Sequence, residues 1–168
     1  MKRHLLLLLL FSFYSCSDGE LQIDVIDFDD VAIQFCESET TLNSTVFFKI
    51  SGSEALILEL QSGLLKNETA TDTIRSAVPS QSNIIYRLFT ETVSKDYFCA
   101  DIPPITPTVV DEVLAEAGEV LITTIQSDTD TTQFVHSLIL KDITLVNEEG
   151  ERITNTQIED FGTITTQE

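Results

Sequence analysis

Apolar and polar residues alternate along most of the chain after residue 21, which is the pattern of β-strands. In 45–51 (TVFFKIS) the alternation predicts that Val46, Phe48 and Ile50 point inward and Lys49 points outward. The segments predicted to be strands are rich in β-branched and aromatic residues. They are 31–35 (VAIQF), 45–51, 54–61 (EALILELQ), 83–91 (NIIYRLFTE), 118–126 (GEVLITTIQ) and 134–146 (FVHSLILKDITLV).

Two of these strands carry further information about their faces. In 54–61 Leu56, Leu58 and Leu60 share one face, while Glu59 lies on the other. In 83–91 apolar residues occupy both sets of alternating positions, so both faces of this strand are expected to be partly covered.

Turn-forming residues separate the strands. SGSE, residues 51–54, predicts a tight hairpin, and NEEGE, residues 147–151, predicts a turn in which Gly150 takes a positive φ. The polar segment 66–82 predicts a long exposed loop. IPPITP, residues 102–107, is excluded from a central strand because proline supplies no donor to the ladder.

The segment 109–117 fits two structures. Val110, Val113, Leu114 and Ala117 fit the stripe of a helix. Residues 109–114 also fit an edge strand, which the β-rich flanks favour. About eight strands with turns between them predict an all-β fold, an antiparallel β-sandwich, with a small β-barrel as the alternative.

The first fifteen residues follow another pattern. Lys2 and Arg3 precede the apolar run 5–11, and the small residues Ser12 and Ser15 follow it. This is the layout of a secretory signal peptide, and the run is shorter than the roughly 20 apolar residues of a membrane-spanning helix. An ordinary signal peptide and a lipoprotein signal peptide are both compatible with this layout.

The residues around Cys16 resemble those of a known class. FYSC, residues 13–16, resembles a bacterial lipobox, and SDGE, residues 17–20, resembles the acidic export signal of surface lipoproteins of the Bacteroidota. The resemblance implies a signal peptide at 1–15, a lipid on Cys16 and a tether at 16–20. It implies a membrane partner through this anchor and a location at the outer membrane, at the cell surface or alternatively at its periplasmic face.

The rest of the chain adds to this resemblance. The stretch from FFKISG to IPPITPTV is similar to that of small lipoproteins of the same bacterial group, and this similarity implies no catalytic residue. Residues 21–168 suit one domain with its own core.

The net negative charge of the chain excludes some classes of binding partner. The sequence has nine basic and 28 acidic residues, and removal of Lys2 and Arg3 with the signal peptide leaves seven basic ones, a net charge of −21. Such a surface argues against nucleic-acid binding and against electrostatic docking on anionic lipid.

Three cysteines remain to be assigned. If Cys16 carries a lipid, Cys36 and Cys99 are left as a pair, which is expected to be a disulfide outside the cytoplasm. Such a bridge contributes about 4 kcal/mol in the chain-entropy model. The alternative is two buried free thiols.

The remaining residues offer little catalytic chemistry. His136 is the only histidine after the signal peptide, and it lies inside a predicted strand, where a structural role is expected. Zinc requires three or four Cys or His ligands, and a Ser/His/Asp triad would have to use His136. No catalytic residue and no cofactor are therefore predicted.

Carboxylates and short motifs leave two kinds of candidate site. Asp128 and Asp130 in SDTDTT have the opening spacing of a calcium loop, with a solvated acidic turn as the alternative. Thr73 and Thr131 lie in DTI and DTT, which resemble the short O-glycosylation motif of the Bacteroidota.

The sequence thus predicts a lipid-anchored envelope protein that acts as a non-enzymatic binding or interaction module for an envelope protein or an extracellular ligand. Two alternatives remain open. One is a secreted hydrolase that uses carboxylates or calcium, and the other is a structural component of the envelope.

Overall fold

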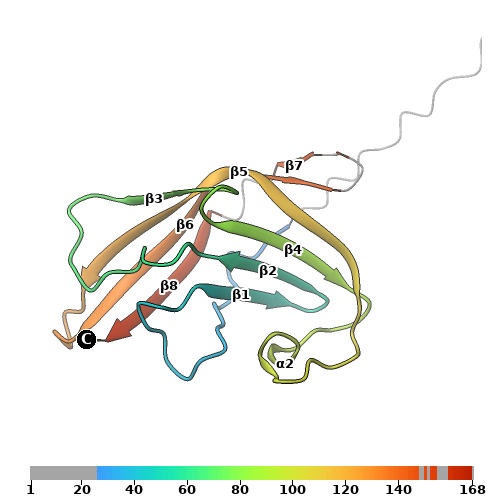
Figure 1. The fold of residues 1–168 in the computed structure, drawn as a ribbon, viewed down its shortest axis with the longest axis horizontal. Helices are drawn as coiled ribbons and strands as arrows, with labels where there is room; N and C mark the ends of the chain where they lie inside the picture. Colours follow the sequence, from blue (N-terminus) through green and yellow to red (C-terminus); the bar gives the residue numbers. More distant parts are fainter. Residues whose placement is uncertain (1–25, 148–149, 151, 155–158, 168) are drawn as a thin grey trace, which may run out of the picture.

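The structure is a computed structural model that describes residues 26–147, 150, 152–154 and 159–167 (Figure 1). Strands account for almost all of the regular secondary structure in these residues, with one short helix, so the predicted all-β class is confirmed. The elements are β1 (Val46–Ser51), β2 (Glu54–Glu59), β3 (Ile74–Ala77), β4 (Asn83–Phe89), α2 (Lys95–Cys99), β5 (Val109–Gln126), β6 (Gln133–Val146), β7 (Arg152–Thr154) and β8 (Asp160–Gln167).

The strands form one antiparallel sheet. Its order is β1-β2-β4-β5-β6-β7, with β3 paired to β5 and β8 paired to β6. Figure 1 shows this sheet curled on itself into a half-barrel. The expected sandwich of two separate sheets is not confirmed, because β5 and β6 are hydrogen-bonded to the strands of both walls.

The curl lies in the two long strands. The first part of β5 pairs with β4 and its second part pairs with β3, and the register with β6 shifts on both sides of Ala117. Next to this shift Gly118 has φ +130°, and Asp142 in β6 has φ +54°. Bulges bend a strand and increase its twist, so this place turns one wall of the sheet towards the other.

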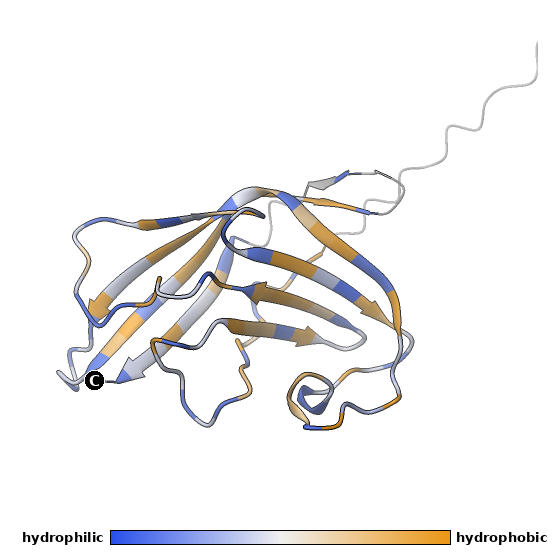
Figure 2. Ribbon diagram, viewed as in Figure 1, coloured by the Kyte–Doolittle hydropathy of each residue, from blue (hydrophilic) through white to orange (hydrophobic). Residues whose placement is uncertain are grey.

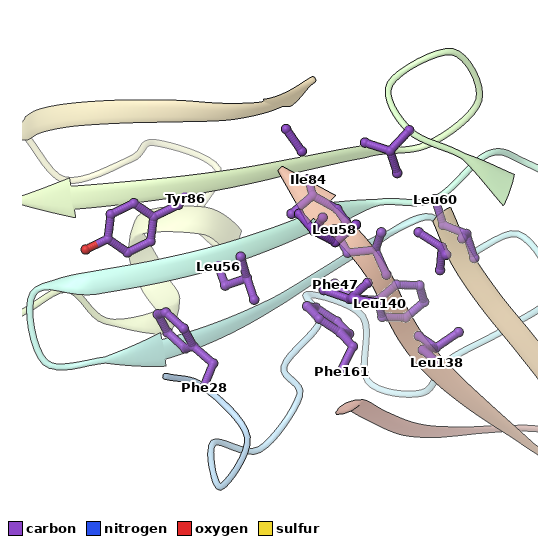
Figure 3. Packing of buried hydrophobic residues seen from close by; sticks show 14 of the residues in the cluster. Phe28, Phe47, Leu56, Leu58, Leu60, Ile84, Tyr86, Leu138, Leu140 and Phe161 are labelled. Carbon is purple, nitrogen blue, oxygen red and sulfur yellow. The ribbon is translucent and has the colours of Figure 1, made fainter. Parts of the chain in front are cut away.

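The main hydrophobic core fills the concave side of the half-barrel (Figure 3). Leu56, Leu58 and Leu60 lie in it, as their alternation predicts. Phe28 from the segment before β1 and Phe161 from β8 pack into the same cluster and are fully buried. Figure 2 shows the corresponding hydrophobic stretches along β1, β2 and β4.

The segment 26–40 connects the two edges of the curled sheet. Gln34 exchanges both main-chain hydrogen bonds with Phe48 of β1, at 2.7 and 2.9 Å. Six residues later the Thr40 hydroxyl donates to the main-chain oxygen of Thr165 in β8. The segment therefore runs from one edge strand to the other, and the strand expected at 31–35 is reduced to an isolated bridge at Gln34.

The structure also tests the predictions for three other segments. The segment 109–117 is strand, as its flanks favoured, and forms the first half of β5. The polar segment 66–82 is not loop throughout, because it contains β3. The hairpin at 51–54 is confirmed by the pairing of Ser51 with Glu54.

The helix α2 has no counterpart among the predicted elements. It has five residues, which is too short for a helical periodicity to show in the sequence. No helix in the described ranges has the length and apolar character needed to cross a bilayer.

Candidate functional site

A small aromatic layer covers the convex side of β1, β2 and β4. The ring of Phe98 in α2 stacks on that of Phe48 in β1, with centroids 4.5 Å apart and planes 25° apart. Phe98 also meets Phe89 of β4 edge-on at 6.3 Å. Ile57 and Ile85 are buried beside Phe48, so this wall of the half-barrel is covered on both faces, as predicted for 83–91.

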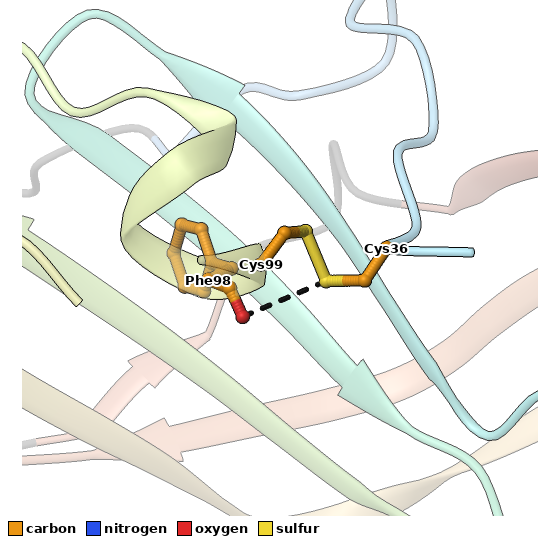
Figure 4. Close-up of a disulfide and its surroundings, with 3 residues drawn as sticks. All are labelled: Cys36, Phe98 and Cys99. Atoms are coloured by element: carbon orange, nitrogen blue, oxygen red, sulfur yellow. Dashed lines mark hydrogen bonds between the residues drawn. A yellow bond between two sulfur atoms is a disulfide. The ribbon is translucent and has the colours of Figure 1, made fainter. Parts of the chain in front are cut away.

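A disulfide fixes this layer. Cys36 of the segment 26–40 is bonded to Cys99, the last residue of α2, across 63 residues of sequence (Figure 4). The Sγ atom of Cys36 also lies 3.5 Å from the main-chain oxygen of Phe98. A disulfide sulfur carries no proton, so this is a contact and not a donated hydrogen bond. The predicted Cys36–Cys99 pair is confirmed, and it ties α2 to the segment 26–40.

His136 is fully buried in β6, and both of its ring nitrogens have partners. Nδ1 lies 2.8 Å from the hydroxyl of Thr124, and Nε2 lies 2.8 Å from that of Thr166. The Thr166 hydroxyl donates its one proton to Oδ1 of Asn67 at 2.5 Å. Nε2–H of His136 must therefore donate to Thr166, which leaves Nδ1 to accept from Thr124.

This chain of bonds requires a neutral imidazole. Burial lowers the pKa of His136 below its ordinary value. A protonated ring would present a second N–H to the Thr124 hydroxyl, which now donates to that nitrogen. The arrangement gives His136 a structural role that joins β5, β6, β8 and the loop at Asn67.

Lys49 is placed opposite to the prediction. Its side chain points inward from β1 and is 2% exposed. Nζ donates to the main-chain oxygens of Phe28 at 2.6 Å and of Asp160 at 3.0 Å, and it lies 5.5 Å from the centroid of the Phe161 ring. The prediction was wrong because β1 is covered on both faces, so that Phe48 lies under α2 while Phe47 and Lys49 face the concave side.

Acidic side chains surround the position of Lys49. Burial lowers the pKa of Lys49, although the charges of Asp160, Asp29 and Asp27 act in the opposite direction. The pKa of Asp29 is raised, first by desolvation and then by the neighbouring Asp27. These carboxylates belong to DVIDFDD and to the start of β8, two stretches that the sequence gives no reason to bring together.

The calcium candidates lie in the turn between β5 and β6. The Asp130 carboxylate accepts hydrogen bonds from the main-chain N–H of Thr132 at 3.0 Å and from its hydroxyl at 2.7 Å, and both bonds lower its pKa. Asp128 is exposed in the same turn. The described residues contain no group of three His, Cys, Asp or Glu side chains arranged to hold a metal ion, so calcium binding here stays a prediction.

The modification candidates have different positions. Thr73 and Thr131 are both exposed, the first just before β3 and the second in the turn before β6. Glycosylation of either residue stays a prediction. Cys16, with the signal peptide and the tether, lies outside the described residues.

Open hollows mark the surface formed by the described residues, and three of them are well defined. One of about 400 Å³ lies between the segment 35–40 and β8 and is lined by hydroxyl, amide and carboxylate groups together with apolar surface. A second, of about 340 Å³, contains Glu159, Asp160, Ser137 and Thr163. A third, of about 260 Å³, adjoins Thr124. His136, the candidate for a Ser/His/Asp triad, lines none of these three hollows.

The buried side chains of Lys49 and His136 therefore have structural roles. Sequence reasoning missed the buried position of Lys49 and the cover formed by Phe98. The adjacent pair Phe47–Phe48 was the available signal, because neighbouring strand residues point to opposite faces and two large apolar neighbours need two covers. Comparison of the chain with family models, with curated proteins and with solved structures finds no match.

Proposed function

We propose that this chain is a lipid-anchored protein of the bacterial cell envelope whose half-barrel is a non-enzymatic binding or interaction module. The observation that supports the proposal is the Cys36–Cys99 disulfide. It uses two of the three cysteines and leaves Cys16, the residue that follows the signal-like leader, for another chemistry.

The disulfide and the leader support the same compartment. Structural disulfides persist outside the cytoplasm, where thiols are not kept reduced. A lipid attached to Cys16 would then place the domain 21–168 at the outer membrane, since two or three acyl chains hold a protein much more firmly than one. The acidic residues Asp18 and Glu20 support display at the cell surface, with the periplasmic face as the alternative.

A binding role is supported by how the unusual side chains are used. Lys49 and His136 are both buried and are hydrogen-bonded to neighbouring main-chain and hydroxyl groups. Side chains held in this way stabilise a scaffold. Partners would then meet the loops and outer faces of the half-barrel, as is usual for rigid β-scaffolds.

Metabolic labelling tests the anchor directly. A clickable fatty acid added to growing cells should label the wild-type chain, and Cys16→Ala should abolish the label. Cys99→Ala is the matched control, because it removes a cysteine that the proposal does not assign to lipid. Label that persists in Cys16→Ala would refute the anchor.

The non-enzymatic role of the half-barrel needs a separate test. Purified protein should not turn over glycoside, ester or peptide substrates. Turnover that is lost on Glu159→Gln or Asp160→Asn would favour the secreted hydrolase, since these residues line one of the hollows. Crosslinking on intact cells to one abundant envelope neighbour, without saturable ligand binding, would favour a structural component of the envelope.

A further inference from the structure

The loop between α2 and β5 exposes two large apolar side chains. Ile102 is 86% exposed and Ile105 is 92% exposed, whereas the next most exposed large apolar residues, Val110 and Ile125, are each 59% exposed. Isoleucine is among the residues most often buried in folded proteins. Two that project almost completely from one short loop therefore call for an explanation at the level of binding.

Both ends of this loop are fixed to the half-barrel. At its start, Cys99 is held by the disulfide, and the N–H of Ala100 donates to the main-chain oxygen of Asp96 at 3.0 Å. At its end, the N–H of Thr108 donates to the Thr90 hydroxyl at 3.1 Å, and the N–H of Thr90 donates back to the oxygen of Thr108 at 2.9 Å. The loop is thus closed at its base by covalent and hydrogen bonds.

The loop is also restricted within itself. Pro103, Pro104 and Pro107 each fix their own φ angle, and each limits the residue before it. A loop that is already ordered loses less conformational entropy when it binds. The two isoleucines are accordingly presented on a preorganised backbone, and Figure 2 shows hydrophobic positions along the stretch that follows α2.

Acidic residues form a border beside this loop and at its base. Asp101 and Asp111 lie on the two sides of the loop in sequence, and Glu91 adjoins Thr90 at its base; all three are exposed. A negative border favours a positive one on the partner and steers its approach. The same charge, with −21 on the mature chain, disfavours a second copy of this chain and an anionic lipid surface.

We propose that the loop 101–107 is a recognition loop whose Ile102 and Ile105 insert into an apolar groove of a partner protein that is rimmed by Lys and Arg. This inference rests on the proposed role as a binding module and assigns that role to a surface. It commits to a protein groove with basic residues at its border, where the isoleucines supply burial and the acidic border supplies orientation.

A defined probe tests the loop. The full-length chain with Cys16→Ser, which lacks the lipid, is titrated with an amphipathic helical peptide that has Leu on one face and Lys on the other. A second peptide has Glu in place of Lys. We expect the Leu/Lys peptide to bind and the Leu/Glu peptide not to bind. We expect the double substitution Ile102→Ser with Ile105→Ser to raise the Kd of the Leu/Lys peptide at least tenfold.

A matched variant separates the loop from general acidity. Ile125→Ser with Ile139→Ser also removes two exposed isoleucines without a change in charge, but from β5 and β6. It should leave the Kd within twofold of the parent. An equal loss in both double variants, or no loss in either, would overturn the proposal. Circular dichroism and urea unfolding confirm that each variant is folded.

Vesicles provide the competing outcome. Sedimentation with phosphatidylcholine vesicles, and with vesicles that also contain phosphatidylglycerol, should recover no protein. Sedimentation that depends on Ile102 and Ile105, without loop-dependent peptide binding, would replace the protein groove by a lipid surface and overturn the proposal. Because the lipid-free chain is used, loss of the loop effect would leave the Cys16 labelling result unchanged, so the two proposals fail separately.

Discussion

Nζ of Lys49 lies 2.6 Å from the main-chain oxygen of Phe28, so a charged side chain inside the first strand holds the segment that precedes it. A second bond from the same nitrogen reaches the oxygen of Asp160 in β8. One ammonium group thereby joins β1, β8 and the segment 26–40. Because Lys49 lies on the concave side, its ammonium group helps to close the half-barrel and is not part of the surface.

Loss of this ammonium group should destabilise the fold. Lys49→Met keeps the length of the side chain but leaves two main-chain oxygens without their donor, and an unsatisfied buried acceptor costs about 1–3 kcal/mol. We expect the free energy of unfolding in urea to fall by about that amount or more. Lys141→Met is the control, because Lys141 is exposed, and it should stay within about 0.5 kcal/mol. Equal stabilities of the two variants would contradict the role of Lys49.

Acidification should destabilise the protein through His136. Its folded-state pKa is lowered by burial, so the unfolded chain binds a proton near the ordinary pKa of about 6.5 while the folded chain does not. The free energy of unfolding is therefore expected to fall as pH decreases from about 6.5 towards the lowered pKa, by at most about 1.4 kcal/mol per pH unit.

Two measurements check this prediction. Urea unfolding between pH 7.5 and 5 should show a smaller pH dependence for His136→Gln than for the wild type. If that variant does not fold, the C2 proton of the His136 ring in the wild type can be followed by NMR. A ring that titrates at its ordinary pKa in the folded protein would show that the Thr124–His136–Thr166 arrangement does not keep it neutral.

Removal of the disulfide should weaken the fold and loosen α2. For a sequence separation of 63 the chain-entropy model gives about 4 kcal/mol for Cys36→Ser with Cys99→Ser. The double variant should also bind more of a hydrophobic dye, because Phe48, Ile57 and Ile85 lie beneath the helix. Wild-type protein in a dithiol reductant should unfold at the same urea concentration as the variant. Full stability under reduction would contradict this account.

A methyl group at residue 118 should disturb the curl of the sheet. Gly118 has φ +130°, and a Cβ there would lie 2.5 Å from Cδ1 of Ile143 and 2.9 Å from the main-chain oxygen of Lys141. Gly118→Ala should therefore cost more than about 2 kcal/mol in urea unfolding. Gly63→Ala is the matched control, since it has φ +82° and open space, and it should cost about 1 kcal/mol. A larger loss at Gly63 would refute this view of the bend.

The sequence predicted where most strands lie better than it predicted which of their faces are buried. Leu56 and Leu58 of β2 and the following Leu60 were placed correctly, because they form an uninterrupted apolar row at alternate positions. Lys49 was not, because alternation shows that neighbours face opposite sides and cannot show that both sides are covered. β3 was hidden in a polar stretch, since Ser76 is buried by a hydrogen bond to Ser82 and not by apolar contact.

Among the candidate sites, only the disulfide could be predicted, from the number of cysteines. With Cys16 expected to carry a lipid, Cys36 and Cys99 were left as the pair, and the structure confirms their disulfide. The closeness of Asp29 and Asp160 to Lys49 depends on how the segment 26–40 crosses the open side of the half-barrel, and no local pattern carries that path. The exposure of Ile102 and Ile105 likewise follows from where α2 and β5 fix the loop ends.

The path of the segment 26–40 has a mechanical consequence. Tension applied from the N-terminal side enters the described domain at Ile26 and would first detach Phe28 and the bonds of Lys49. Peeling then stops at Cys36, after an extension on the order of 35 Å, because the load passes through the disulfide to Cys99. Under tension the domain would thus extend over a short distance and then resist further unfolding at the disulfide.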